Sequence, residues 1–378
     1  MNEEVLELAT RIVRQANLAK VPADEELRTF FRKHPPVARR YGRELSQVVF
    51  RFYRWSRFAN PKDSLAAKLR FANLRAEEFA RNASSFSLRA LRLAVPKWLE
   101  REMEAPYEWL SAIQREPVLW IRAKQGSIAK VKESLAISEN DIGSIPEALA
   151  YHGQEDLYRH PLFKAGEFEI QDVASQLVGR LCAPQPKETW WDACAGAGGK
   201  TLHLSDLMKN KGLIWSTDRS RRRISLLKKR AAKAKAFNVR TREWDGGDKL
   251  PTKTKFDGVL VDAPCSGVGT WQRNPHARWT TTVSVVKELA DVQSRLLTNI
   301  ARSVKRGGKL IYAVCTLTDR ETKAVVADFS KRFPEFEPLE LGYDGMSGEP
   351  SSELTIWPQD EGGNGMFVAG WRRKEQTS

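Results

Sequence analysis

The stretch FDGVLVDAPCSGVGT occupies residues 256–270 and decides the fold. Its first part, 256–261, is an apolar and β-branched run, which is typical of a buried parallel strand. Asp262 and Cys265 come directly after this run, in a glycine-rich segment that predicts a tight loop. Open α/β folds bind ligands at the carboxyl edge of the sheet, so we expect these two side chains to lie at a ligand site.

On both sides of this stretch, strand-like and helix-like segments alternate regularly. Alternation at this spacing implies an α/β fold with a parallel, doubly wound sheet, which is a Rossmann-like arrangement. A late strand at 366–372 is expected near one edge. The predicted strands are 189–193, 213–217, 239–244, 256–261 and 309–314, and the predicted helices are 200–209, 219–236, 283–304 and 320–332.

The chain before residue 171 has a different pattern. Residues 1–60 are expected to be all-helical, with further helices at 65–82 and at 97–114, the latter with a possible break at Pro106. Short strands at 118–123, 148–152 and 168–170 suggest a small α+β segment. We therefore divide the chain into a helical domain (1–95), linker helices with the small α+β segment (96–170), and a Rossmann-like domain (171–378).

The charge balance points to a polyanionic partner. The chain has 62 Lys and Arg against 47 Asp and Glu, a net charge of +15. A balance this basic favours nucleic acid first and an anionic membrane surface second. In the helix expected around 43–57, an apolar stripe (Leu45, Val48, Val49, Phe52) faces a basic side (Arg43, Arg51, Arg54, Arg57). That basic side is either an RNA-docking face or an ordinary solvated one.

The four cysteines, Cys182, Cys194, Cys265 and Cys315, contain no C-x-x-C pair. This argues against a metal site and a disulfide framework, and fits a reducing compartment. The acidic, amphipathic start MNEEVLELATR does not resemble a secretory signal, and no apolar run is long enough to span a bilayer. We therefore expect a cytoplasmic monomer with no membrane partner.

A glycine-rich turn lies at 191–201, WDACAGAGGKT. Glycines let a ligand approach the backbone, and the N–H groups of the helix that follows face it. The turn suits a dinucleotide, a nucleotide phosphate or S-adenosylmethionine. It is not a P-loop, because residue 194 is Cys where the first glycine would stand, and it is not G-x-G-x-x-G, because residue 201 is Thr.

Acids end the first three strands of the predicted sheet: Asp192, Asp218 and Asp245. An acid at the position of Asp218 can accept hydrogen bonds from ribose hydroxyls. Each Asp alone could equally cap a helix or a turn. Three in register favour a nucleoside pocket.

The two thiols after predicted strands, Cys265 and Cys315, are the most specific feature. C5 of cytosine is a poor nucleophile, but it becomes enamine-like when a thiolate adds to C6. Such chemistry needs a thiol of lowered pKa, a covalent intermediate, an acid at the N3 edge and a base taken out of its stack. Cys265, Cys315 and Asp262 meet these needs for methyl transfer from a sulfonium donor.

The motifs WDACAGAGGKT, FDGVLVDAPCSGVGTWQRNP and LIYAVCTL, in this order and spacing, resemble the RsmB/Sun family of RNA (cytosine-5) methyltransferases. FEIQDVASQL and GNGMFVAGW resemble the segments that open and close its catalytic domain. The resemblance covers residues 118–373. More faintly, YGRELSQVVFRFYRW resembles the NusB-like RNA-binding domain that precedes the catalytic domain in the family's 16S rRNA enzyme.

The resemblance implies a role for each site residue. Cys315 would add to C6, Cys265 would assist breakdown of the adduct, Asp262 would bind the cytosine and lie near the methyl donor, and Lys200 would lie beside cofactor and base. The implied S-adenosylmethionine pocket consists of Cys194, Ala195, Gly196, Ala197, Gly198, Gly199, Lys200, Asp218, Arg223, Asp245 and Asp262.

Two departures from the family pattern concern loop shape rather than reacting groups. The usual C-A-A-P-G-G-K-T reads CAGAGGKT here, and Val314 replaces a frequent threonine. The resemblance favours small-subunit rRNA over tRNA as substrate. A DNA cytosine-5 methyltransferase and a non-catalytic RNA-binding ribosome assembly factor are the alternatives. The former would use the first cysteine as nucleophile, with a Glu-Asn-Val motif after it.

Overall fold

The computed structural model describes residues 2–343, 346 and 348–375. The chain forms two compact units. The helical unit contains the residues up to Pro117 together with Thr270–Val283, and the sheet unit contains Val118–Gly269 and the residues from Ser284 onward. The division into three domains, with a NusB-like first domain, stays a prediction.

Helices build the helical unit because each buries one apolar stripe. Asn2 caps the first helix by accepting a hydrogen bond from the amide of Glu4, and Ser64 caps the fourth in the same way through Ala67. The aromatic core centres on Trp55, whose ring lies 5.2 Å from Phe79. The helices are α1 (Glu3–Ala19), α2 (Ala23–Lys33), α3 (Pro35–Trp55), α4 (Leu65–Arg81), α5 (Leu88–Leu91), α6 (Tyr107–Ala112) and α12 (Ala277–Thr280).

One expectation for this unit holds in part and one is wrong. The segment 97–114 does break at Pro106: it consists of a short 3-10 turn, Lys97–Arg101, and of α6, whose N-cap is Pro106. On α3, Arg54 is only 2% exposed and donates to the carbonyl of Gln272 at 2.7 Å. Arg54 therefore belongs to the core and not to a solvated basic face.

The segment Thr270–Val283 packs into the helical unit although it follows the cysteine loop in sequence. Its residues Trp271 and Arg278 are fully buried. Arg278 donates to the side chain of Gln114 at 2.6 Å and to the carbonyls of Ile113 and Trp271. Burial holds the pKa of Arg278 well below its usual value. The acceptors that these bonds give the side chain are an amide oxygen and backbone carbonyls.

The described part of the sheet unit contains an eight-stranded sheet in the order β10-β11-β8-β7-β4-β5-β6, with β9 pairing with β11. The strands β4 to β8 are parallel, and β11 runs antiparallel to β8. The chain therefore reverses its direction of winding between β4 and β7, the place where such sheets bind ligands. The bounds are β4 (Thr189–Asp192), β5 (Leu213–Asp218), β6 (Val239–Glu243), β7 (Phe256–Asp262), β8 (Val304–Val314), β9 (Phe336–Pro338), β10 (Glu353–Ile356) and β11 (Met366–Arg373).

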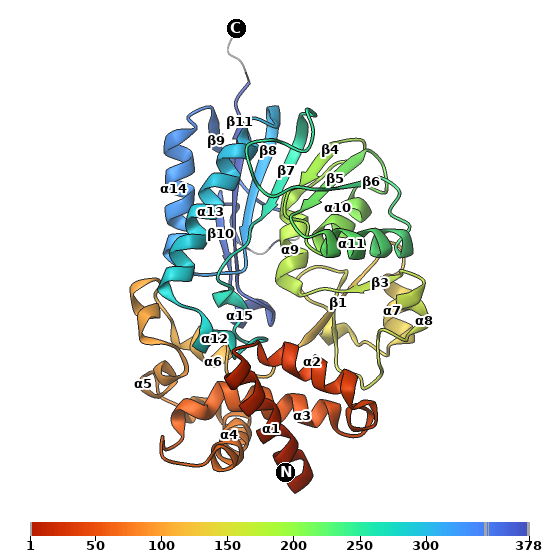
Figure 1. Ribbon diagram of the computed structural model, residues 1–378. Helices are drawn as coiled ribbons and strands as arrows, with labels where there is room; N and C mark the ends of the chain where they lie inside the picture. Colours follow the sequence, from red (N-terminus) through yellow and green to blue (C-terminus); the bar gives the residue numbers. More distant parts are fainter. Residues whose placement is uncertain (1, 344–345, 347, 376–378) are drawn as a thin grey trace. The chain divides into compact units, whose positions relative to one another are not determined.

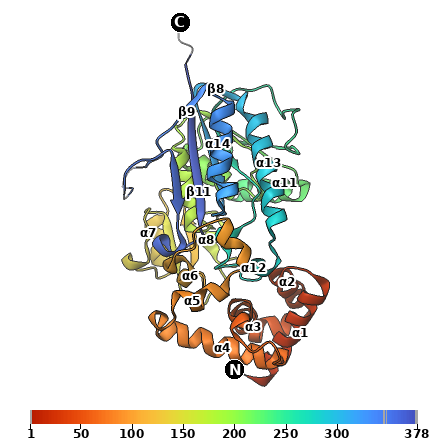
Figure 2. The same cartoon turned by 90° about the vertical axis from the view of Figure 1, so that its left-hand side faces the viewer.

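Helices cover both faces of this sheet (Figure 1 and Figure 2). On one face, α13 (Val283–Ala301) and α14 (Lys323–Arg332) pack on apolar side chains of β4, β7 and β8. On the other, α9 (Val173–Cys182) and α10 (Gly199–Leu207) pack on the alternate side chains of the same strands. A further helix, α11 (Arg221–Lys233), packs against α10 and β6. The predicted Rossmann-like, doubly wound fold is confirmed.

The strand after α13 is longer than expected. The sequence predicted a helix to residue 304 and a strand from 309, whereas α13 ends at Ala301 and β8 begins at Val304. A register shift in the β7–β8 pairing between Phe256 and Gly258 accommodates the extra residues. Neither β9 nor β10 was predicted.

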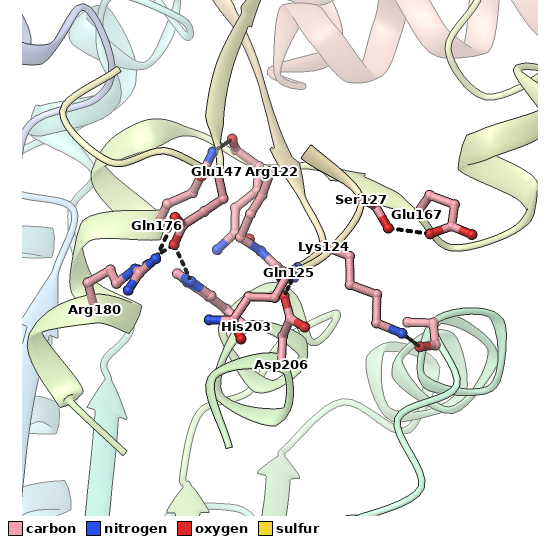
Figure 3. A network of polar contacts seen from close by, with 12 residues as sticks. Arg122, Lys124, Gln125, Ser127, Glu147, Glu167, Gln176, Arg180, His203 and Asp206 are labelled. Carbon is pink, nitrogen blue, oxygen red and sulfur yellow. Dashed lines mark hydrogen bonds and ion pairs between the residues drawn. The ribbon is translucent and has the colours of Figure 1, made fainter. Parts of the chain in front are cut away.

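The predicted α+β segment is a three-stranded antiparallel sheet in the order β2-β1-β3, within the described residues. A buried polar network joins it to α9 and α10 (Figure 3). Glu147 accepts a bidentate ion pair from Arg180 at 2.5 and 2.6 Å and lies 3.3 Å from His203. Arg122 pairs with Asp206 at 3.2 Å. The elements are β1 (Leu119–Ala123), α7 (Ile128–Ser134), β2 (Ala148–Tyr151), α8 (Pro161–Lys164) and β3 (Phe168–Ile170); the short helix α15 (Pro358–Glu361) follows β10.

Among the described residues, no helix is both long enough and apolar enough to cross a membrane.

Candidate active site

The glycine turn joins β4 to α10 at the carboxyl edge of the sheet. Gly196 and Gly198 both have positive φ, +56° and +89°, which L side chains rarely adopt. A Cβ on Gly198 would meet the side chain of Leu227 at 2.7 Å, so this glycine allows α11 to pack closely. A Cβ on Gly196 would meet no heavy atom of the described residues within 4 Å. The turn therefore has open space beside Gly196.

Asp218 ends β5 beside this turn. One of its carboxylate oxygens accepts from the amide of Gly196 at 3.0 Å, and the other from the amide of Ser220 at 2.7 Å. A carboxylate offers about four lone-pair sites, so acceptor capacity remains for a hydroxyl pair. Together with the open space at Gly196, this fits a nucleoside ribose, and hence the S-adenosylmethionine that the sequence predicts.

Two further members of the predicted cofactor set, Arg223 and Asp245, have weaker or indirect contacts with Asp218. Arg223 is 62% exposed and lies 3.7 Å from the Asp218 carboxylate. Asp245 is exposed and accepts from the amide of Gly247 at 2.9 Å, while the amide of its neighbour Trp244 donates to the Asp218 carbonyl at 3.2 Å. Arg223 is therefore near the end of β5 through a weak ionic contact, and Asp245 through the backbone hydrogen bond of its neighbour.

Cys194, in the turn itself, is partly buried, and burial raises its pKa. It is therefore a neutral thiol. The remaining members of the set, Ala195, Ala197 and Gly199, belong to the same turn and to the first residue of α10.

The two thiols meet at the ends of β7 and β8. The Sγ atoms of Cys265 and Cys315 lie 3.3 Å apart. This proximity follows from the parallel register, which pairs Asp262 with Ala313, and from the bond of the Gly269 amide to the Cys315 carbonyl at 3.1 Å. The sequence-based prediction that these cysteines lie together at one edge agrees with this geometry.

Lys200 and Asp262 form an ion pair beside the thiols. The Lys200 Nζ lies 2.8 Å from the Asp262 carboxylate, and Lys200 is 8% exposed. Burial alone would lower the pKa of Lys200, but the charge and hydrogen bond of Asp262 outweigh it and raise that pKa. Lys200 therefore carries a fixed positive charge in the site.

The environment distinguishes the two thiols. Their mutual hydrogen bond raises the pKa of Cys265, and burial adds to this; the same hydrogen bond lowers the pKa of Cys315, against the effect of burial. A bond between two identical groups does not by itself choose the donor. The charge of Glu321 disfavours a thiolate at Cys265. At Cys315 the charge of Asp262 opposes a thiolate and that of Lys200 favours one. Cys315 is therefore the thiol whose pKa is lowered, and Cys265 the one whose pKa is raised.

Glu321, which the sequence-based prediction missed, ties the two cysteine loops together. It is fully buried and accepts from the amide of Ser266 at 2.8 Å, from Thr318 Oγ1 at 2.9 Å and from Gln293 Nε2 at 3.0 Å. The first donor is next to Cys265, and the second lies three residues after Cys315. Glu321 is therefore a positioning residue. The acid in CTLTDRE after the second thiol was visible in the sequence, but nothing there showed that it is buried.

The arrangement combines three chemical capabilities. Cys315 supplies a thiol of lowered pKa that can act as a nucleophile, Cys265 a neutral thiol in hydrogen-bond reach of it, and Lys200 with Asp262 a polar pair that can recognise a hydrogen-bonding edge. At the same sheet edge, the glycine turn has open space beside Gly196, and Asp218 keeps acceptor capacity for a nucleoside hydroxyl. Such a site can hold a nucleoside-containing donor beside a covalently bound acceptor.

Comparison with protein families gives one match over more than half of the chain. The family model described as 16S rRNA methyltransferase RsmB/F matches residues 180–372. The match includes the glycine turn, both cysteines, Lys200 and Asp262.

Curated relatives match beyond this region. The chain is 31% identical over 297 residues to the probable ribosomal RNA small subunit methyltransferase B of Bacillus subtilis, covering 74% of this chain and 66% of that protein. It is 30% identical over 322 residues to the probable protein of the same name from Synechocystis, covering 79% and 72%. The chain thus spans about two thirds of the length of such relatives.

Solved structures share the fold. PH0851 aligns with a TM-score of 0.77 at 23% identity, over 98% of this chain and 99% of that one. NSun6 from Pyrococcus horikoshii, determined with SFG, aligns with a TM-score of 0.64 at 19% identity, over 74% and 99%.

Proposed function

The chain belongs to the 16S rRNA methyltransferase RsmB/F family, and from this premise we propose that it forms 5-methylcytosine in RNA through a covalent adduct between Cys315 and C6 of the target cytosine. The observation that carries the proposal is the thiol pair, 3.3 Å apart, with its asymmetric charged surroundings. The resemblance seen in the sequence is confirmed at the level of the family.

S-adenosylmethionine is the cofactor of this family's chemistry and, when bound, supplies an electrophilic methyl group on a sulfonium sulfur. The residues of this chain that would hold it are the turn from Cys194 to Gly199, Lys200, Asp218 and, further out, Arg223, Asp245 and Asp262. Asp218 would accept from the ribose hydroxyls, since it is bonded to the amide of Gly196, a residue with open space beside it.

Cys315 begins the reaction. Its thiolate attacks C6, forming the S–C6 bond, and the C5–C6 π electrons move to give a nucleophilic C5. Once C5 carries the methyl group, a base removes the C5 proton and the S–C6 bond breaks. The electrons of the C5–H bond rebuild the C5–C6 double bond, and Cys315 leaves as a thiolate.

Cys265 assists the last step. The Cys265 thiol, held neutral, donates a hydrogen bond to the sulfur of Cys315 and so stabilises it as a leaving thiolate. Without this donor the adduct is expected to persist.

Asp262 and Lys200 orient the base. The Asp262 carboxylate accepts a hydrogen bond from the exocyclic amino group at the N3 edge of the cytosine, and Lys200 fixes that carboxylate through their ion pair. Because C6 is inaccessible to a side chain inside a stack, the cytosine must be flipped out or single-stranded.

Small-subunit rRNA is the proposed substrate, since the curated relatives carry that name. tRNA is the alternative RNA. A DNA enzyme, which would use the first cysteine as nucleophile, is disfavoured because the later cysteine, Cys315, is the one whose pKa is lowered. We place the chain in the cytoplasm as a monomer, with residues 1–95 as a NusB-like RNA-binding domain, 96–170 as the linking segment and 171–378 as the catalytic domain.

The test is an adduct trap. Cys265→Ala, mixed with S-adenosylmethionine and a 16S rRNA transcript, is expected to give a covalent protein–RNA band on a denaturing gel. Cys265→Ala/Cys315→Ala should give none. The wild type should release RNA that contains 5-methylcytidine, detected by mass spectrometry of the nucleosides.

The controls are bulk tRNA and DNA of the same sequence. A band with tRNA alone would replace rRNA by tRNA as substrate. A band that persists in the double variant would refute the role of Cys315, and release of RNA without 5-methylcytidine would refute the cytosine-5 reaction.

A further inference from the structure

A second pocket lies wholly within the helical unit, with a volume of about 750 Å³. Its walls come from the end of α1, from α3 and the turn after it, from α4 and from the segment 270–283. This volume is within the range of roughly 300–1,000 Å³ that small-molecule sites occupy. It is therefore large enough for one nucleotide.

The charges in this pocket have one sign. Lys20, Arg57 and Lys68 line it, and none of its described lining residues is an Asp or Glu. Lys68 is oriented by donating to the carbonyl of Pro61 at 2.8 Å. An anion is therefore the complementary ligand.

Aromatic rings also line this pocket and are held in place. Trp279 donates from its indole nitrogen to the carbonyl of Tyr53 at 2.8 Å, and the ring of Tyr53 lies 4.3 Å from that of His276. His276 in turn accepts from the amide of Ala23 at 3.0 Å. These contacts fix the ring of Trp279, which is only partly buried.

A cation already lies on the Trp279 ring. The Arg57 guanidinium is 4.8 Å from its centroid. Nucleic-acid bases stack on both guanidinium planes and aromatic rings, so a base can extend this pair. An anion next to a flat aromatic group is the chemical description of a nucleotide.

We propose that this pocket binds an unpaired nucleotide of the RNA substrate, separate from the target cytosine. The base packs against Arg57 and Trp279, and the phosphate pairs with Lys20 and Lys68. The inference rests on the proposed RNA methyltransferase function and adds a second recognition point to it. Trp279 follows Cys265 by only fourteen positions in the sequence, so one loop of the chain supplies residues to both sites.

The test measures the affinity of the full chain for its RNA by fluorescence anisotropy across a salt series. Lys20→Glu/Arg57→Glu should weaken binding at least about tenfold and flatten the salt dependence, because cation–phosphate contacts release counterions. Trp279→Ala should weaken binding about fivefold or more with little change in the salt slope, because it removes stacking. Trp279→Phe keeps a ring and should recover most of the affinity.

The matched control is Arg14→Glu/Arg89→Glu, which makes the same change in net charge at exposed positions outside this pocket. Equal weakening and flattening by the control would overturn the inference, because overall charge would then account for the effect. Unchanged binding by folded Trp279→Ala, checked by thermal melting, would also overturn it. The proposed function has its own test: a wild type that methylates no RNA would refute that function, whereas the binding measurements on the variants test only this pocket.

Discussion

At the scale of single residues, the candidate site depends on a difference between two chemically identical side chains. Cys265 and Cys315 share one hydrogen bond, which is the largest cause of the raised pKa of Cys265 and of the lowered pKa of Cys315. Burial raises the pKa of the other two thiols, Cys182 and Cys194. Cys315 should therefore be the most reactive thiol at neutral pH.

The rate of alkylation of Cys315 by iodoacetamide against pH tests this assignment. A lowered pKa means that the thiolate is present from a lower pH, so the wild-type rate should level off below the usual thiol range. Cys265→Ala removes the largest cause of the lowering, and Lys200→Met removes the nearby cation. Both should move the inflection to higher pH, and Cys265→Ser, which keeps a hydroxyl donor, should move it less. Peptide mass spectrometry reports the modified cysteine, and an identical inflection in all variants would contradict the asymmetry.

At the scale of elements, the sequence predicted which side chains lie at the strand ends, but it did not predict the buried contacts that hold them in position. The alternating pattern placed Asp262, Cys265 and Cys315 at one sheet edge, because parallel strands end together. The buried carboxylate of Glu321 and the glycines that bring helices together depend on contacts between distant segments. Periodicity within a segment carries no information about them.

Gly179 in α9 is such a contact point. A Cβ there would lie 2.2 Å from Nδ1 of His203 in α10. His203 is itself held by Glu147, and burial lowers its pKa to about 4. Gly179→Ala should therefore lower the free energy of unfolding by about 1–3 kcal/mol, measured by urea denaturation. In a His203→Ala background the same change should be less damaging, because the ring is gone; an equal loss in both backgrounds would refute the clash.

Gly42 in α3 is a helical glycine at which, unlike at Gly179, a methyl group would fit. A Cβ at Gly42 would meet the ring of Phe31 only at 3.8 Å, an ordinary contact. Gly42→Ala should stabilise the protein by about 0.5–1 kcal/mol, because glycine in a helix loses more conformational entropy on folding.

At the scale of the whole molecule, the chain passes twice between its units. It leaves the sheet unit after Gly269, packs into the helical unit as Thr270–Val283, and returns at α13. The sequence predicted domains that follow one another along the chain, and it did not predict that 270–283 packs into the helical unit. Trp271 and Arg278 look like parts of a surface loop until their buried partners are known. Arg54 was misplaced for the same reason, because its acceptor, the carbonyl of Gln272, lies in that segment.

Arg278 anchors the segment, and its replacement gives the prediction that belongs to this scale. Arg278→Met keeps much of the side-chain volume but leaves the carbonyls of Ile113 and Trp271 without their buried donor. Each unsatisfied buried acceptor costs about 1–3 kcal/mol, so we expect a loss of about 2–4 kcal/mol from the helical unit. Amide hydrogen exchange should then rise in 109–114 and 270–283, while the strands β7 and β8 stay protected. Arg89→Met, at an exposed position, is the control. Unchanged exchange in 270–283 would mean that packing of Trp271 alone holds the segment, whereas equal loosening of β7 would mean that the segment and the sheet unfold as one cooperative body.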